Sequence, residues 1–301
     1  MKSAAALLAT VLVASPVAAE APKAGAAPRS ILFIGNSFTQ GAHSAVRNWR
    51  ASSVTDLNRA GYGGVPALFK AFTEQAGLNY AVSLETQGGK SLGFHYDERR
   101  SLFDRPWDVV VLQEFSTLNR ERPGDSSATV RDTKRLADLL QRRNPKVQIN
   151  LMATWSRADL TYKPGSRWSG SNIAVMAGDL HMASQAVCRD VAAVQQVLPV
   201  GTAWNRAFET GIADPNPYDG IAFGKLDLWA YDHYHGSVPG YYLEALIVFG
   251  AITGVDPTGL GKDEWAADEL GLSDQQAVAL QKVAKDELAS RRGSRCMVSA
   301  R

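Results

Sequence analysis

The feature that most constrains the fold is the apolar run at residues 31–34, which stops abruptly at Gly35, Asn36 and Ser37. Four consecutive apolar residues rich in Ile and Phe are typical of a strand buried on both faces, and Gly-Asn indicates a turn. Parallel sheets contain such strands, and their ligands bind beyond the carboxyl ends of the strands. The pattern therefore makes the hydroxyl of Ser37 the first candidate nucleophile.

Strand and helix patterns alternate along the rest of the chain. Strands are predicted at residues 80–84, 108–112, 147–153 and 198–201, and helices at 65–77, 129–143, 172–196, 241–249 and from 273 onward. This alternation predicts an α/β fold in which a parallel sheet is covered by helices on both faces. The loops beginning at Gly35, Thr86 and Gln113 would then gather along one edge of the sheet.

The start of the chain has the pattern of a secretory signal peptide. Residues 1–19 hold a lysine, an apolar run and a stretch of small residues, and the apolar run is shorter than the roughly 20 residues that a membrane span needs. We therefore expect an exported protein, periplasmic or secreted. Residues 20–29 would be a flexible lead-in and residues 30–301 a single domain.

The net charge is +2 at pH 7, from 32 Lys and Arg against 30 Asp and Glu, and the basic residues form no stripe. This balance provides no electrostatic reason to expect nucleic acid or an anionic membrane as a partner. Two cysteines, Cys188 and Cys296, are too few for a metal cluster. In an oxidising compartment they could pair, and two free thiols are equally compatible with the sequence.

A second polar cluster completes the candidate machinery. Asp232 and His235 are three residues apart, a spacing that on a tight turn lets the carboxylate accept a hydrogen bond from one imidazole nitrogen. That bond would set the tautomer of the histidine and leave its other nitrogen free to act as a base.

Taken in order, these residues resemble the SGNH, or GDSL-like, hydrolases. Gly35-Asn36-Ser37-Phe38 is similar to the family's first block, which carries the nucleophile, and Asp232 with His235 to its last block. Gly89-Lys90-Ser91 is similar to the second block, whose glycine donates a backbone N–H to the oxyanion hole. The resemblance implies a flavodoxin-like three-layer α/β/α fold and a serine esterase with a Ser37-His235-Asp232 triad.

The third block departs from the family pattern, because Gln113-Glu114-Phe115-Ser116 stands where Gly-x-Asn-Asp is usual. A glutamine here is similar to the variant in sialate O-acetylesterase-like carbohydrate esterases. The resemblance thus implies an oxyanion hole made by Ser37, Gly89 and Gln113, and an O-acetyl carbohydrate ester as substrate. Asn36 in place of the family's aspartate is a second departure.

Other interpretations remain open at this point. Ser91 lies in a Gly-x-Ser-x-Gly pattern, but Gly88 and Gly93 weaken the strand-to-helix turn that a nucleophile elbow requires. A metal at Asp232, His233 and His235 would lack a third or fourth ligand motif, so neither a metal nor a cofactor is predicted. His43 and His95 are expected in surface or loop positions near the site. Alternative functions are a lipase or thioesterase, or a non-catalytic carbohydrate-binding module.

Overall fold

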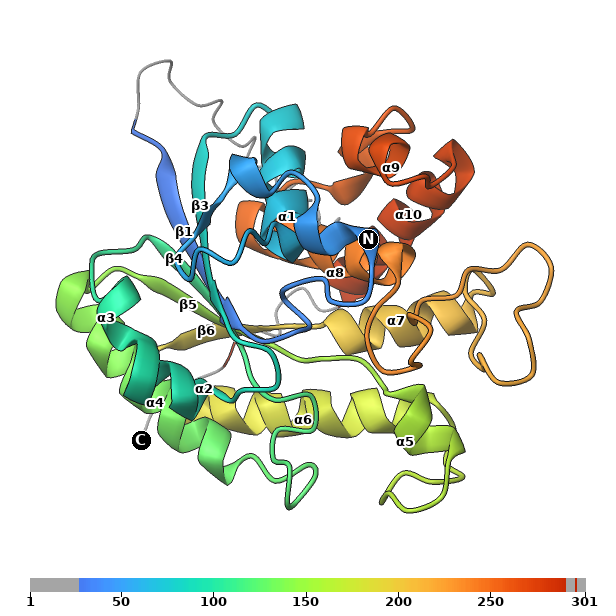
Figure 1. Ribbon diagram of the computed structural model, residues 1–301, viewed down its shortest axis with the longest axis horizontal. Coiled ribbons are helices and arrows are strands. Elements are labelled where there is room, and N and C mark those ends of the chain that lie inside the picture. Colours follow the sequence, from blue (N-terminus) through green and yellow to red (C-terminus); the bar gives the residue numbers. More distant parts are fainter. Residues whose placement is uncertain (1–26, 291–295, 297–301) are drawn as a thin grey trace, which may run out of the picture.

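The structure, a computed structural model, describes residues 27–290 and residue 296. Its centre is a six-stranded sheet with the strand order β2-β3-β1-β4-β5-β6, and every neighbouring pair is parallel (Figure 1). The strands are β1 (Arg29–Gly35), β2 (Thr55–Asp56), β3 (Tyr80–Thr86), β4 (Val109–Gln113), β5 (Gln148–Met152) and β6 (Val194–Leu198). The predicted parallel α/β architecture is confirmed.

The central strand β1 is buried on both faces because its side chains alternate between two hydrophobic cores. Ile31 and Phe33 belong to one core, and Leu32 and Ile34 belong to the other. A strand directs successive side chains to opposite faces, so a continuous apolar run is what a strand between two helical layers requires. Each such side chain contributes about 1.5–3 kcal/mol when it is fully buried.

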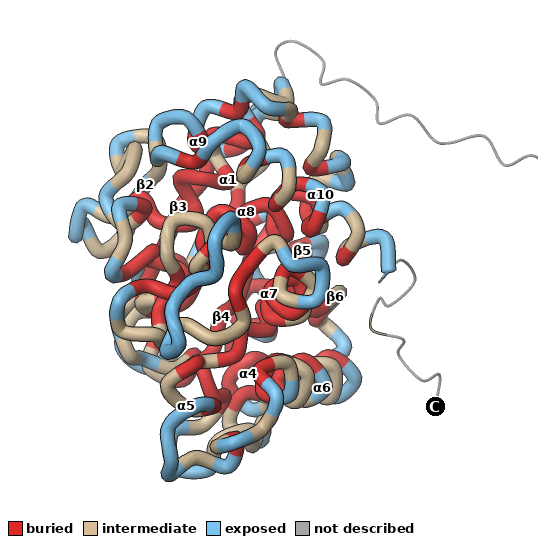
Figure 2. Tube along the Cα trace, turned by 90° about the vertical axis from the view of Figure 1, so that its right-hand side faces the viewer, coloured by how far each residue is buried: buried red, intermediate tan, exposed pale blue. Residues whose placement is uncertain are grey.

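Helices cover both faces of the sheet (Figure 1). Residues of α1, α7, α8, α9 and α10 share one core with the sheet, and residues of α2, α3, α4 and α6 share the other. Buried segments run through the sheet and the inward sides of these helices (Figure 2). The helices are α1 (Gly64–Gln75), α2 (Leu92–Phe94), α3 (Arg100–Phe103), α4 (Ser127–Arg143), α5 (Ala158–Tyr162), α6 (Ala174–Asp190), α7 (Val200–Glu209), α8 (Val238–Thr253), α9 (Trp265–Glu269) and α10 (Asp274–Ser290).

The predictions of a helix at residues 172–196 and a strand at residues 198–201 were partly wrong, because the helix ends earlier and the strand lies earlier. Helix α6 ends at Asp190, residues 194–198 form β6, and α7 begins directly after Pro199. A few valines at helical spacing fit a short buried strand equally well. Residues 194–198 form a strand because they pair with the free edge of β5. Pro199 suits the start of α7, because the first helical N–H groups need no intrahelical partner.

The C-terminal part of the fold holds a capping box and a disulfide. The N–H of Ser273 donates to Gln276 Oε1 at 2.9 Å, and the N–H of Gln276 donates to Ser273 Oγ at 3.3 Å. Cys188, buried on α6, pairs with Cys296 across a sequence separation of 108 residues. No helix within residues 27–290 combines the length and apolar character that crossing a membrane requires. The predicted signal peptide lies outside the described residues, and Arg29 of the predicted lead-in is already part of β1.

We predict that Cys296→Ser lowers the free energy of unfolding by about 2–4 kcal/mol, because a bridge that closes a loop of this length restricts the unfolded chain. Urea unfolding of the variant and of the wild-type protein, each with and without reductant, measures the effect. Reductant should lower the stability of the wild type to that of the variant. Equal stability of the two without reductant would show that the bridge contributes nothing.

Candidate active site

The candidate nucleophile lies in a tight turn directly after β1. The N–H of Gln40 donates to the carbonyl of Asn36 at 3.0 Å, and Asn36 Oδ1 accepts from the N–H of Phe38 at 3.2 Å. Such a side-chain to backbone bond is typical of Asn in turns. Phe38 is fully buried and stacks on Trp155, with ring centroids 4.1 Å apart. The turn is therefore anchored on its inner side, and Ser37 lines a cavity on its outer side.

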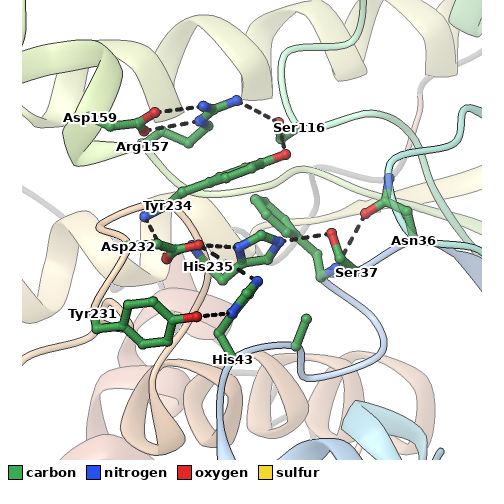
Figure 3. Close-up of polar contacts among 12 residues, drawn as sticks. Asn36, Ser37, His43, Ser116, Arg157, Asp159, Tyr231, Asp232, Tyr234 and His235 are labelled. Atoms are coloured by element: carbon green, nitrogen blue, oxygen red, sulfur yellow. Dashed lines mark hydrogen bonds and ion pairs between the residues drawn. The ribbon is translucent and has the colours of Figure 1, made fainter.

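The structure brings Ser37, His235 and Asp232 into one hydrogen-bonded chain (Figure 3). His235 Nε2 lies 2.9 Å from Ser37 Oγ, and His235 Nδ1 lies 2.6 Å from Asp232 Oδ2. Asp232 Oδ1 also accepts from the backbone N–H groups of Tyr234 and His235, which holds the carboxylate in place. His233, which lies in the same turn, has a left-handed backbone conformation at φ 56°. Its ring packs against that of Tyr218 and therefore points to a neighbour other than Ser37.

Electrostatics favour a neutral imidazole beside an ionised carboxylate. Burial lowers the pKa of His235 from 6.5, and the neighbouring Asp232 carboxylate only partly opposes this shift. For Asp232, burial raises the pKa, but hydrogen bonds from the His235 ring and from two backbone N–H groups outweigh it and lower the pKa below 3.8. At pH 7 the free Nε2 of His235 can therefore accept a proton from Ser37.

A cavity of about 540 Å³ opens in front of Ser37 Oγ and is also lined by His235 and Gly89. Gly89 has a φ of 70°, a conformation that L side chains rarely adopt, so the loop needs glycine here. Within the described residues, the N–H groups of Ser37 and Gly89 donate to no protein acceptor. Two backbone donors beside a candidate nucleophile are the usual elements of an oxyanion hole.

The expectation that the Gln113 side chain completes this oxyanion hole was wrong. Gln113 is fully buried, and its Oε1 accepts from the N–H of Asn36 at 2.9 Å and from Thr39 Oγ1 at 3.1 Å. Its Nε2 donates to the carbonyl of Glu114. The oxygen and the nitrogen of the amide thus both form hydrogen bonds inside the protein, and Gln113 supports the turn that carries Ser37 from its buried side. Gly35 must be glycine for the same reason, since a Cβ there would lie 2.8 Å from Gln113 Oε1.

Asn36, the other departure from the family pattern, joins all three loops. Its Nδ2 donates to the carbonyl of Lys90 at 3.0 Å and to that of Glu114 at 3.3 Å. These carbonyls belong to the loop after β3 and the segment after β4, while Asn36 itself follows β1. Only an amide can donate twice to backbone carbonyls and still accept from Phe38, so Asn rather than Asp fits this junction.

Glu114 supports the same junction from the segment after β4, and the sequence did not single it out. Its carboxylate accepts from the N–H of Phe115 at 2.6 Å and from that of Leu92, the first residue of α2, at 3.3 Å. Burial raises the pKa of Glu114 to about 7, although both backbone hydrogen bonds oppose the shift. Glu114 therefore changes its protonation near neutral pH directly behind the Gly89 loop.

His43 is a further residue beside the triad. Its Nδ1 lies 2.7 Å from the hydroxyl of Tyr231, its Nε2 lies 3.9 Å from Asp232 Oδ2, and its ring lies 4.5 Å from that of His235 (Figure 3). Among the described residues, His43, Asp232 and His235 form the one group whose donor atoms lie close enough to hold a metal ion, within 4.8 Å of one another. His235 and Asp232 already form a hydrogen bond with each other, so a metal ion would compete with the hydrogen bonds that link Asp232 and His235 to Ser37.

Two other residues considered in the sequence, Ser91 and His95, have different surroundings from those of the triad. Ser91 lines a neighbouring cavity whose lining includes Glu114 but no histidine, so the alternative nucleophile has no imidazole base in that cavity. His95, expected near the surface, is fully buried, and its Nδ1 bonds the equally buried carboxylate of Glu85. Glu85 is on β3, ten residues before His95, and no local spacing rule links a strand residue to a histidine beyond the following loop.

Comparison with known proteins identifies the fold. No family model and no curated protein matches the sequence. Among solved structures, a DUF4886 family protein from Bacteroides uniformis superposes with a TM-score of 0.57 at 17% identity, over 87% of this chain and 95% of the other. A protein assigned as a GDSL-like lipase from Parabacteroides merdae superposes with a TM-score of 0.51 at 17% identity, over 77% and 99%. The chain has the GDSL-like hydrolase fold.

This GDSL-like fold explains why the three polar loops meet. β1 pairs with β3 on one side and β4 on the other, and the register places Gly35 beside Thr86 and Ile34 beside Leu112. The loops after these three strands are therefore neighbours at one edge of the sheet. The SGNH-like fold predicted from the motifs is confirmed.

We predict that Asn36→Asp lowers the free energy of unfolding by about 3 kcal/mol or more, because an ionised carboxylate would face the carbonyls of Lys90 and Glu114 without a donor. Asn48→Asp is the matched control, since Asn48 also donates to a backbone carbonyl, that of Gly61, but is exposed. Urea unfolding at pH 7 measures both variants. Similar losses in the two would contradict a special role for the junction.

We predict that Glu114 makes the protein less stable as the pH rises. Its pKa is about 7 in the folded chain against 4.5 ordinarily, so the folded state binds more protons and stability falls between those values. Relative to Glu114→Gln, the wild type should lose about 3 kcal/mol between pH 4.5 and pH 8. Urea unfolding across this range tests the difference, with the exposed Glu121→Gln as the control. A rise in wild-type stability relative to Glu114→Gln would reverse the assignment.

Proposed function

We propose that this protein is a serine hydrolase that cleaves carboxylic esters, with Ser37 as nucleophile, His235 as general base and Asp232 as the residue that orients the base. The observation that supports this most directly is the hydrogen-bonded chain from Ser37 Oγ through His235 to Asp232, at 2.9 Å and 2.6 Å. The fold adds support, because it is shared with a protein assigned as a GDSL-like lipase.

The proposed reaction has two halves. Ser37 Oγ attacks the ester carbonyl while His235 Nε2 takes the hydroxyl proton, and the imidazolium is stabilised by Asp232. The oxyanion of the tetrahedral intermediate accepts from the N–H groups of Ser37 and Gly89. His235 then returns the proton to the departing alcohol, which leaves an acyl group on Ser37. A water molecule, deprotonated by the same histidine, releases the carboxylic acid and restores the serine.

The finer assignments are also proposals. An O-acetyl group on a carbohydrate is the substrate implied by the resemblance to carbohydrate esterases, and a lipid ester or thioester is the alternative. Export to the periplasm or the medium is supported by the signal-like pattern of residues 1–19 and by the pairing of Cys188 with Cys296, since disulfides persist in oxidising compartments.

We predict that purified protein hydrolyses p-nitrophenyl acetate and that Ser37→Ala lowers kcat by about 10³-fold or more, because the reaction loses its nucleophile. Ser91→Ala is the matched control and should retain wild-type kcat. Release of p-nitrophenol measures both. Activity that survives Ser37→Ala and disappears in Ser91→Ala would move the nucleophile to Ser91. Absence of hydrolysis with any ester, together with measurable glycan binding, would favour the carbohydrate-binding module.

A further inference from the structure

A second cavity adjoins the one in front of Ser37. It has a volume of about 340 Å³, and both cavities are lined by Gln40, Arg47 and Gly88. The second cavity extends over the loop after β3, whose Gln87 and Gly88 immediately precede the candidate oxyanion donor Gly89. A ligand with its ester at Ser37 could therefore place a neighbouring group in this second cavity.

Positive charge is concentrated around both cavities. Arg47, Arg120 and Arg157 line the first, Arg47 and Arg99 line the second, and no Asp or Glu lines either. Arg157 is already paired with Asp159. Within the described residues, Arg47, Arg99 and Arg120 form no ion pair. Arginines that lack carboxylate partners attract an anion into such a recess.

The two arginines of the second cavity are partly buried rather than free in solvent. The Nε atoms of Arg47 and Arg99 are both buried without a hydrogen-bond partner among the described residues. Arg47 also lies over the ring of Tyr62, 4.4 Å from its centroid, and donates to the hydroxyl of Tyr62 at 2.5 Å. Its side chain is thus held beside the cavity, which lowers the entropy lost when it binds an anion.

The remaining wall of the second cavity is polar and uncharged. Amides of Gln40, Asn58 and Gln87 and the hydroxyl of Thr86 contribute to it, and its apolar side-chain surface comes from the methyl group of Ala60 and the ring of Tyr62. Amides and hydroxyls can both donate to and accept from sugar hydroxyls, whereas an acyl chain requires an apolar wall. This wall fits a sugar ring better than a lipid chain.

We propose that the substrate is an ester of an acidic sugar, with the sugar carboxylate bound by Arg47 and Arg99 in the second cavity and the ester placed at Ser37. The assignment of the ester rests on the proposed function, while the anion-binding cavity stands on its own geometry. A planar carboxylate matches the paired donors of a guanidinium. A sulfated sugar presents a similar charge, so the experiment includes both anions.

The binding test uses the full chain with Ser37→Ala, which prevents turnover. Isothermal titration with trigalacturonate, sulfated carrageenan oligosaccharide and neutral xylotriose should give the tightest binding for trigalacturonate, at least 10-fold over xylotriose, and weaker binding at high salt. Arg47→Gln and Arg99→Gln, each added to Ser37→Ala, should lower affinity for trigalacturonate about 10-fold. Arg142→Gln, an exposed arginine outside both cavities, is the control for the change in charge and should leave affinity unchanged. Equal binding of the acidic and neutral sugars overturns the proposal, and tighter binding of the sulfated sugar overturns the carboxylate assignment.

A second measurement separates this inference from the proposed function. If the wild-type protein hydrolyses esters, kcat/KM for acetylated oligogalacturonide should exceed that for acetylated xylo-oligosaccharide at least 10-fold. Hydrolysis without this preference would leave the esterase in place and remove the acidic-sugar assignment. Failure to hydrolyse any ester, with trigalacturonate binding that depends on Arg47 and Arg99, would remove the esterase and leave the anion-binding cavity.

Discussion

The candidate site depends on one buried side-chain amide, that of Asn36. Its Nδ2 binds carbonyls from two other strand ends, and its Oδ1 closes the turn that carries Ser37. Gln113 adds a second amide directly below, which accepts from the N–H of Asn36. Buried amides are stabilising only when their donors and acceptors are paired, so this junction forms only when β1, β3 and β4 have paired in register.

Apolar packing holds the same junction from the inner side. Phe38 stacks on Trp155, and Trp155 stacks on Trp204 with centroids 4.6 Å apart. Trp229, just before the turn with Asp232 and His235, packs against Trp204 at 5.5 Å. The aromatic rings therefore connect the turn of the nucleophile with the turn of the base, two segments that are almost 200 residues apart in the chain. Aromatic pairs prefer stacked or edge-to-face arrangements, so these contacts also favour a defined geometry.

The charges around the site divide into two groups with different environments. The carboxylates of Asp232 and Glu114 lie behind the reacting groups and are bound by backbone N–H groups. The guanidinium groups of Arg47, Arg99 and Arg120 line the open side, where a ligand would arrive. An anionic ligand would therefore approach positive charge first.

Much of this fold could be predicted from the sequence, because the run at residues 31–34 and the repeated strand and helix patterns are local signals. Local signals also predicted Ser37 as the candidate nucleophile at a strand end and Asp232 as the partner of His235, and the resemblance to the SGNH hydrolases implied that the three residues meet. The end of α6 was mispredicted because valine-rich segments suit either a strand or a helix, and pairing with β5 decides between them. The roles of Gln113 and Asn36, the protonation of Glu114, and the arginine-lined cavities were decided only by the tertiary structure. The physical reason is that a polar side chain takes its role from the groups beside it, and here those groups come from strands that are distant in sequence.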